Sequence, residues 1–228
     1  GFAKEVFMAL DRDIAYRETM KDGETVSPGD VVATLEGATR AILTAERVAL
    51  NILQRLSGIA TLTRTFVDAA SGTKARILDT RKTTPGIRRM EKYAVTMGGG
   101  MNHRGNLTEM ALIKENHIAV AGSIRRAVEL VRARTPVPIE VEVRTMEELR
   151  EAVEATVEQI MLDNWDTVSM RDAVAFVAGR VPLEASGNMT VERVREVAAT
   201  GVDLISVGAL THSARALDMS LLQEGVGA

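Results

Sequence analysis

Cationic side chains gather in the middle of this sequence. The 44 residues from Lys74 to His117 carry nine Lys or Arg side chains against four Asp or Glu. That segment is net +5, and since the whole chain of 228 residues is net −3, the remainder is net −8. A solvated basic face would explain the segment. A site that gathers these groups would instead bind a strongly anionic ligand, because Arg and Lys are the side chains that bind carboxylates and phosphates.

Polar side chains also stand at the ends of six short apolar runs that have the character of β-strands. One run contains Glu140 and Glu142, two residues apart and therefore on one face of a strand. The pattern does not decide which of the two is the site carboxylate, and we assign that role to Glu142. The other polar and glycine residues at or near these ends are Asp79, Arg81, Lys82, Asn102, His103, Arg104, Lys114, Asp163, Asn164, Ser186, Gly187, Asn188, Ser206 and Gly208.

Two loops of small residues, 186–188 and 206–208, are suited to phosphate binding. Each follows an apolar run, and a small residue leaves the backbone N–H groups accessible to an anion. Glu142 and Asp163 would face the cationic residues and could hold Mg²⁺ through water beside substrate phosphates. The sequence therefore predicts a site for phosphates, Mg²⁺ and a second anionic substrate.

The elements that position these residues follow a regular rhythm. Apolar markers in the last four runs lie 21, 23 and 21 residues apart, from Ile139 to Leu204. Helical patterns fill the gaps, with N-caps predicted at Ser123, Thr145 and Thr190. Alternating strands and helices predict a parallel sheet, and short units without a dinucleotide fingerprint favour a barrel, whose site lies at the carboxyl ends of its strands. The predicted strands are 75–78, 111–113, 139–143, 159–162, 181–185 and 203–207.

The first part of the chain has a different pattern. Helical spacing covers Phe2–Leu10, a strand is predicted over Val31–Leu35, and Thr44 is predicted to cap the next helix. The predicted organisation is a small α/β unit over 1–43, an α/β barrel over 44–210 and a C-terminal segment over 211–228, for which a return to the first unit is left open.

Composition restricts the class of protein. Apolar residues make up 46% and charged residues 26%, which excludes disorder, collagen and coiled coil as the main architecture. No apolar run approaches the ~20 residues that cross a bilayer, so no membrane association is expected. The absence of cysteine excludes disulfides and thiol nucleophiles and fits a cytoplasmic location. Seven aromatic residues are too few for base-stacking recognition of nucleic acid.

Several strings resemble signatures of the decarboxylating quinolinate phosphoribosyltransferases. The stretch 44–51 reads TAERVALN, 77–88 reads ILDTRKTTPGIR, and 98–118 reads GGGMNHRGNLTEMALIKENHI. The strings IEVEV, IMLDN, LEASGNM and DLISVGALTHSA continue the match in the family's order. The resemblance covers nearly the whole chain, from Gly1 to Leu222.

This resemblance implies a fold and a reaction. The fold is an incomplete, seven-stranded α/β barrel joined to a small α/β sandwich domain, in a homodimer or higher homo-oligomer. The reaction joins quinolinate to phosphoribosyl pyrophosphate in NAD biosynthesis and gives nicotinate mononucleotide, pyrophosphate and carbon dioxide, with Mg²⁺ as cofactor. The family also implies an N-terminal segment before Gly1, which we expect to be missing from this sequence.

Site residues are carried over from the family by position. Arg81, His103 and Arg104 would bind the quinolinate carboxylates, and Arg47 would complete that site from the neighbouring subunit. Because Arg47 lies in a helical pattern, a plain surface arginine is the alternative.

Phosphates would be bound on the opposite side of the same pocket. Lys82, Lys114 and His212 would bind phosphoribosyl pyrophosphate, while Glu142 and Asp163 would face the ribose and the Mg²⁺-pyrophosphate. We count Glu142, Asp163 and Lys82 as catalytic. The backbone of a further set would cradle the 5-phosphate, namely Ser186, Gly187, Asn188 and Gly208.

Three other functions stay open. A related phosphoribosyltransferase-like protein of the molybdenum-transport type would take a different substrate. A barrel aldolase or isomerase would use Lys82 or Lys114 as a Schiff base, although neighbouring anions would raise the pKa of such a lysine. A nucleic-acid binder rests on the basic segment alone. Outside the site, we expect Arg88, Arg89 and Lys92 to be solvated helix residues and His117 to be structural.

Overall fold

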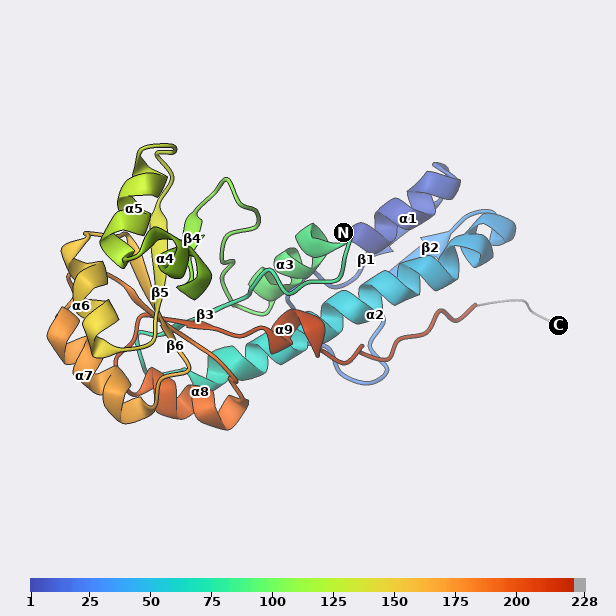
Figure 1. Ribbon diagram of the computed structural model, residues 1–228. Helices are drawn as coiled ribbons and strands as arrows, with labels where there is room; N and C mark the ends of the chain where they lie inside the picture. The colour runs from blue at the N-terminus through green and yellow to red at the C-terminus, as the bar shows by residue number, and fades with distance from the viewer. Residues whose placement is uncertain (224–228) are drawn as a thin grey trace.

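The computed structural model describes residues 1–223. An N-terminal unit and an open barrel lie at opposite ends of one long helix, α2 (Thr39–Ala69) (Figure 1). The N-terminal unit contains α1 (Phe2–Leu10) and the antiparallel strands β1 (Ala15–Glu18) and β2 (Ala33–Glu36). Its small core is formed by buried apolar residues, namely Ala3, Phe7, Ile14, Ala45 and Ala49.

Helix α2 belongs to both units. It packs against α1 near its start and against β3, α8 and α9 further along, so it runs through the predicted division between residues 43 and 44. The predicted N-cap at Thr44 is wrong, because the helix begins five residues earlier at Thr39. The Thr44 hydroxyl donates instead to the carbonyl of Arg40, 2.7 Å away, as threonines inside helices do.

A parallel six-stranded sheet forms the barrel and confirms the predicted fold class. Its strand order is β3-β8-β7-β6-β5-β4, so β3 and β4 are the two open edges. All six predicted strands are present to within two residues, whereas β1 of the N-terminal unit was not predicted. The strands are β3 (Arg76–Leu78), β4 (Ala111–Ile113), β5 (Ile139–Val143), β6 (Gln159–Asp163), β7 (Leu183–Ser186) and β8 (Leu204–Ser206).

Helices cover the outer face of the sheet. The predicted N-caps are confirmed, since the hydroxyls of Ser123, Thr145 and Thr190 each accept a backbone N–H three residues later. No described helix is both long and apolar enough to cross a membrane. The helices are α3 (Arg88–Met97), α4 (Glu115–Ala121), α5 (Ile124–Arg132), α6 (Met146–Glu154), α7 (Thr167–Val177), α8 (Val191–Ala198) and α9 (Ala209–His212).

After α9 the chain runs back beside α2 toward the N-terminal unit (Figure 1). Gln54 fastens it at two points, accepting from the amide of Leu217 at 3.0 Å and donating to the carbonyl of Met219 at 2.6 Å. Gly58 lies directly beneath the carbonyl of Arg215, where any Cβ would overlap that oxygen. The last residues of the predicted C-terminal segment, 224–228, lie outside the described residues.

Within residues 1–223, the barrel has one strand fewer than the seven that the resemblance implies. Met101 forms a single parallel bridge with Leu78, at the place where a further strand would lie beside β3. Its amide donates to Ile77 and its carbonyl accepts from the amide of Asp79. The next donor, the amide of His103, bonds to the Asp79 carboxylate at 2.9 Å, so a side chain ends the ladder after one bridge.

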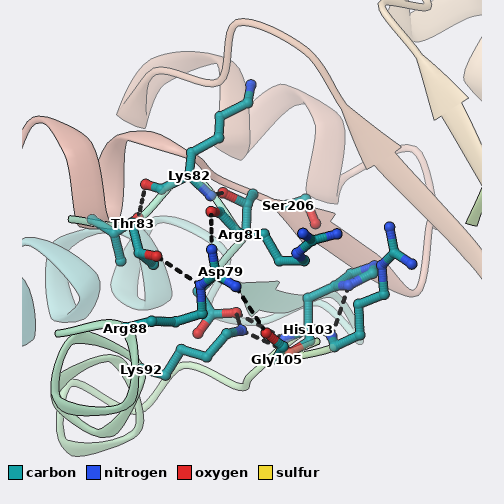
Figure 2. Close-up of polar contacts among 12 residues, drawn as sticks. Asp79, Arg81, Lys82, Thr83, Arg88, Lys92, His103, Gly105 and Ser206 are labelled. Carbon is teal, nitrogen blue, oxygen red and sulfur yellow. Dashed lines mark hydrogen bonds and ion pairs between the residues drawn. The ribbon is translucent and has the colours of Figure 1, made fainter. Parts of the chain in front are cut away.

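Asp79 is fully buried at this edge and pairs with Lys92 from α3 (Figure 2). The Lys92 ammonium contacts the Asp79 carboxylate and donates to the carbonyl of His103 at 2.7 Å. Burial raises the pKa of Asp79, and Lys92 opposes that shift. The prediction that Lys92 is solvated is wrong, since only 7% of it is exposed. Its helix packs that face against the strand end.

Arg88 is also not a simple surface residue. Its guanidinium donates to the hydroxyl of Thr83 at 2.8 Å and to the carbonyls of Gly105 and Arg81 at 3.2 and 3.3 Å. Arg88 and Lys92 therefore join the loop after β3 to the segment after Met101. The prediction of a solvated Arg88 is wrong for the same reason as for Lys92.

Replacing Lys92 tests this edge. Lys92→Met leaves the Asp79 charge buried without its partner, so we expect a loss of about 3–5 kcal/mol in the free energy of unfolding at pH 7. The loss should shrink toward pH 5, because protonation of Asp79 removes the uncompensated charge. Chemical denaturation at both pH values measures it.

Lys74→Met is the matched control. Lys74 pairs with Asp203 at 2.7 Å, but its side chain is 57% exposed, so about 1 kcal/mol or less is expected. Equal losses in the two variants would contradict a structural role for the buried pair.

Candidate active site

The carboxyl ends of the six parallel strands meet at one rim, as the barrel topology requires. Sequence-predicted site residues come from every strand end around this rim. They occupy the loops after β3, β7 and β8, the segment after Met101, the position after β4, and the C-terminal parts of β5 and β6.

Lys82, His212 and Gly208 form one cluster at the rim. A Cβ placed on Gly208 would lie 3.2 Å from Nε2 of His212 and 3.2 Å from Cδ of Lys82. The Thr211 hydroxyl donates to the carbonyl of Lys82 at 2.8 Å, which joins the loop after β3 to α9. The structure therefore brings together two of the three predicted phosphate ligands and one predicted backbone donor.

Arg81 and Arg104 form a second cationic cluster. Burial lowers the pKa of Arg104 and the positive charge of Arg81 lowers it further, so the two guanidinium groups lie within electrostatic range of each other. Among the described residues, Nε of Arg81 is buried and has no hydrogen-bond partner. One nitrogen of the Arg104 guanidinium donates to the carbonyl of Met110 at 2.9 Å. A buried donor without a partner next to another cation indicates a place for an anion.

The loop after β7 has the backbone that an anion cradle needs. Gly187 has φ of +107° and Asn188 has φ of +47°. The side-chain oxygen of Asn164, at the end of β6, lies where a Cβ of Gly187 would be, so only glycine fits there. The Asn188 amide lies 3.4 Å from that same oxygen. Ser186 precedes them at the strand end, as predicted.

The two predicted carboxylates each face a cation. Glu142 on β5 is buried, and its carboxylate accepts from the Lys114 ammonium at 2.7 Å. Asp163 on β6 lies 3.6 Å from the guanidinium of Arg144, which also contacts Glu115. Lys114 is thus placed with the carboxylates, apart from Lys82 and His212 in its contacts.

A network of polar side chains fills the barrel interior below Glu142. His103 Nε2 lies 2.9 Å from Glu140 and 3.4 Å from Glu184. Gln159 donates to Glu140 at 2.9 Å and to Glu184 at 2.7 Å, and the Ser206 hydroxyl donates to Glu184. Both carboxylates are 0% exposed. Sequence reasoning missed Glu184 and Gln159, although a carboxylate inside the apolar run LEAS is a usable signal.

His103 uses both ring nitrogens within the protein. Burial lowers the pKa of His103, whereas the hydrogen bonds to Glu140 and Glu184 raise it by stabilising the proton on Nε2. A second ring proton would have to sit on Nδ1, which accepts the amide of Arg104 at 2.8 Å. The ring therefore donates through Nε2 in this geometry, and it presents no spare donor to a substrate carboxylate.

Glu140, Glu184 and His103 are also the one group of described residues with three metal-ligand atoms close together. Each of those atoms already takes part in a hydrogen bond with another member, Gln159 or Ser206. We therefore interpret the group as a hydrogen-bonded network. This placement also separates the two candidates on β5: Glu140 belongs to the interior network, and Glu142 lies nearer the strand's carboxyl end.

A further buried carboxylate, Glu91 on α3, holds the loop that carries Arg81 and Lys82. It accepts from the amide and hydroxyl of Thr84 at 2.9 and 2.8 Å. It also pairs with Arg55 of α2 at 2.9 Å. Arg55 in turn donates to the carbonyl of Ala214 at 2.8 Å and contacts that of Thr211. Neither Arg55 nor Glu91 was predicted, because nothing in their local pattern distinguishes them from surface charges.

Arg47 lies exposed on α2 and has no hydrogen bond or ion pair with any rim residue within 1–223. Among the predicted site residues, Arg47 is the one that does not contact the rim within residues 1–223 of a single chain. His117, predicted to be structural, accepts the amide of Lys114 at 3.0 Å and helps to cap α4.

Comparison with known proteins gives the same family over the whole length of the fold. Residues 1–57 match the N-terminal domain and residues 59–222 the C-terminal domain of quinolinate phosphoribosyl transferase. A probable nicotinate-nucleotide pyrophosphorylase (carboxylating) of Bacillus subtilis is 46% identical over 220 residues, which cover 96% of this chain and 76% of that protein. A Synechocystis protein of the same name is 45% identical over 224 residues, with the same coverage.

Solved structures agree. The nicotinate-nucleotide pyrophosphorylase of Francisella tularensis superposes with a TM-score of 0.93 at 44% identity, covering 96% of this chain and 79% of that one. NadC from Streptococcus pyogenes gives 0.92 at 42% identity, covering 95% and 78%. With identities above 40% across both domains, the chain belongs to the quinolinate phosphoribosyltransferase family.

Proposed function

We propose that this protein transfers the phosphoribosyl group of phosphoribosyl pyrophosphate to quinolinate and releases carbon dioxide, forming nicotinate mononucleotide and pyrophosphate. The relatives' names describe the same reaction in its reverse, carboxylating direction. The observation that carries the proposal is the pair Arg81 and Arg104, with a buried unpartnered Nε, beside the cluster of Lys82, His212 and Gly208. A dicarboxylate and a polyphosphate are the two anions that such neighbouring clusters would bind.

The proposed roles follow from these positions. Arg81 and Arg104 bind the quinolinate carboxylates and place the ring nitrogen toward the sugar. Lys82 and His212 bind phosphates, and the amides of 186–188 and Gly208 bind the 5-phosphate. Lys114, which donates to Glu142 at 2.7 Å, binds a phosphate of phosphoribosyl pyrophosphate beside that carboxylate. His103 acts through Arg104 in this account, since its ring nitrogens are engaged.

The chemistry needs charge stabilisation and no protein nucleophile. Departure of pyrophosphate leaves positive charge at the anomeric carbon, which the Glu142 carboxylate stabilises electrostatically. Lys82 neutralises charge on the departing pyrophosphate. Once the ring nitrogen is bonded to the ribose it carries a positive charge. That charge stabilises the carbanion left when the adjacent carboxylate departs as carbon dioxide, and a proton then replaces it.

Mg²⁺ is the proposed cofactor. Glu142 and Asp163 end adjacent strands β5 and β6, and carboxylate oxygens are the ligands that Mg²⁺ prefers. Both are engaged with cations, which fits contact through water and through the pyrophosphate better than direct ligation. When bound, Mg²⁺ would neutralise charge on the pyrophosphate.

We also propose a cytoplasmic homodimer in which Arg47 serves the partner's site. Arg47 lies beside apolar side chains that a lone chain leaves in water, since Leu43 is 56% and Val48 is 54% exposed. A groove between α1 and α2, lined by residues that include Val6, Leu10 and Val48, continues this surface. The absence of cysteine supports a reducing compartment.

Product analysis tests the reaction. Incubation with phosphoribosyl pyrophosphate, Mg²⁺ and quinolinate should yield nicotinate mononucleotide and carbon dioxide in equal amounts, measured by chromatography and release of labelled carbon dioxide. Nicotinate offered in place of quinolinate should give no turnover. Turnover of nicotinate alone would overturn the decarboxylating assignment.

Arg81→Ala tests the dicarboxylate site. Losing a charged hydrogen-bond donor should raise KM for quinolinate by about 10- to 100-fold, while KM for phosphoribosyl pyrophosphate changes far less. Arg171→Ala on the outer helix α7 is the control for loss of an arginine. Unchanged kinetics in a folded Arg81→Ala protein would remove Arg81 from the site.

Mixing two inactive variants tests the shared site. Arg47→Ala and Glu142→Ala chains damage different parts, so a mixed dimer rebuilds one intact site from the undamaged halves. Unfolding and refolding the two together should restore up to about one quarter of wild-type activity, as expected for random pairing with one intact site per mixed dimer. Absence of recovery in mixed dimers verified by mass would contradict the cross-subunit role.

A further inference from the structure

Donors and acceptors can be assigned throughout the interior network, which consists of Glu140, Glu184, Gln159, His103 and Ser206. Glu140 accepts from Gln159 at one oxygen and from His103 at the other. Glu184 accepts from Gln159 at Oε2, where His103 also lies 3.4 Å away. Its other oxygen, Oε1, faces only the hydroxyl of Ser206. Each amide or ring N–H can only donate here, whereas a hydroxyl can donate or accept.

One atom in this network can therefore take a proton without losing a hydrogen bond. A proton on either oxygen of Glu140, or on Oε2 of Glu184, would meet an N–H donor. A proton on Oε1 of Glu184 would instead be donated to Ser206, whose hydroxyl reverses its role. Two ionised carboxylates at 0% exposure beside a neutral ring are costly, so the network is built to hold that proton.

The network ends at the backbone of Arg104. Glu140 and Glu184 hold Nε2 of His103, and Nδ1 of the same ring accepts the Arg104 amide at 2.8 Å. The backbone amide and carbonyl of His103 are held by Asp79 and Lys92. The position of the Arg104 peptide thus depends on the ring keeping its Nε2–H tautomer.

We propose that Glu184 is a positioning residue for the substrate dicarboxylate, holding a proton between its Oε1 and Ser206 and orienting Arg104 through His103. The inference rests on the proposed function for its substrate. In this role Glu184 affects substrate binding without contacting the substrate.

The proposal couples quinolinate binding to proton uptake. Burial is the main cause that raises the pKa of Glu184, and the charge of Glu140 also raises it. Hydrogen bonds from His103 and Ser206 oppose this, and the pKa is raised to about 7 in total. A dianion bound at Arg81 and Arg104 disfavours the ionised form further, so the pKa of Glu184 rises on binding. By linkage, quinolinate affinity falls as pH rises above about 7.

Other charged groups surround Glu184 at greater remove. The strands on either side of β7, β6 and β8, bring the neutral Gln159 and Ser206. The next strand, β5, brings Glu140, and the segment after Met101 brings His103. Beyond these, Asp203 accepts the amide of Leu183 at 2.9 Å at the start of β7 and pairs with Lys74. The remaining charges behind His103 are Asp79, Lys92, Arg81 and Arg104.

Glu184→Gln separates this proposal from a purely structural role. Its amide nitrogen would donate to Ser206 and its oxygen would accept from Gln159 and His103, so the variant mimics the protonated state permanently. Wild-type kcat/KM for quinolinate, measured at saturating phosphoribosyl pyrophosphate, should fall by about fivefold or more between pH 6.5 and 8.5. For Glu184→Gln, the ratio of kcat/KM to kcat should change by less than about twofold over the same pH range.

Two further variants are expected to change kcat/KM for quinolinate in different ways. Glu140→Gln removes the same charge but places an amide donor against Gln159 or His103, so kcat/KM should fall at every pH. Ser206→Ala removes both the donor to ionised Glu184 and the acceptor of its proton. Because Ser206 lowers the pKa of Glu184 on balance, the pH-dependent fall should move to higher pH. A Glu184→Gln enzyme with the wild-type pH profile would overturn the proposal while leaving the reaction intact.

A measurement without turnover keeps the two proposals separable. Carbon-13 NMR of glutamate-labelled protein should show one carboxyl titrating near pH 7 that is absent in Glu184→Gln, and quinolinate should move that titration upward. A titration unmoved by quinolinate, in an enzyme that converts quinolinate, would contradict the coupling. Failure of the wild type to convert quinolinate would overturn the proposed function and this inference together, although the titration itself would still report the proton.

Discussion

Repulsion between cations is the constraint on which the rim of this barrel depends. The positive charge of Arg81 acts on the guanidinium of Arg104, and Lys82 follows Arg81 directly in the same loop. Without a substrate anion, these side chains would favour loops that spread apart. The structure counters this with buried carboxylates that bind the loops and leave the guanidinium groups unneutralised.

Three such carboxylate sites surround the two loops. Asp79 binds the backbone of His103 and pairs with Lys92, while Glu91 binds Thr84 and pairs with Arg55. The interior network adds the third, through the ring of His103. Where these carboxylates pair with a cation, the cation is Lys92 or Arg55, and Arg81, Arg104 and Lys82 keep their positive charge for the substrates. Ordering of the loops before substrate arrives lowers the entropy that binding must overcome.

Sequence patterns predicted the strands and helix caps of the barrel well, but not the ion pairs and hydrogen bonds that join them. The six barrel strands and three helix caps follow from local rules, because strand periodicity and N-cap hydrogen bonds are set within a few residues. Lys92 shows where such rules end. It stands on an amphipathic helix among charged neighbours, and only the position of Asp79, 13 residues earlier, makes its burial favourable. The same holds for Arg55 and Glu91, whose pairing spans 36 residues.

The predicted site residues show a similar division. Loop residues such as Gly187 and Gly208 follow from their place at strand ends, and the structure puts both at the rim. The family resemblance carried the assignment of His103 to the quinolinate carboxylates, and the contacts place its ring in the interior instead. That assignment stays a prediction. No local pattern shows whether a histidine at a strand end points outward or inward.

The contacts of Asp79, Glu91 and the interior network order the two cationic segments, 80–84 and 101–104, before a dicarboxylate binds. A crystal structure of the protein with quinolinate tests this ordering most directly. We expect the carboxylates within hydrogen-bond distance of Arg104 and of the buried Nε of Arg81, with the backbone of 80–84 and 101–104 displaced by less than about 1 Å. Quinolinate bound without Arg81, or only after those segments rearrange, would contradict the account.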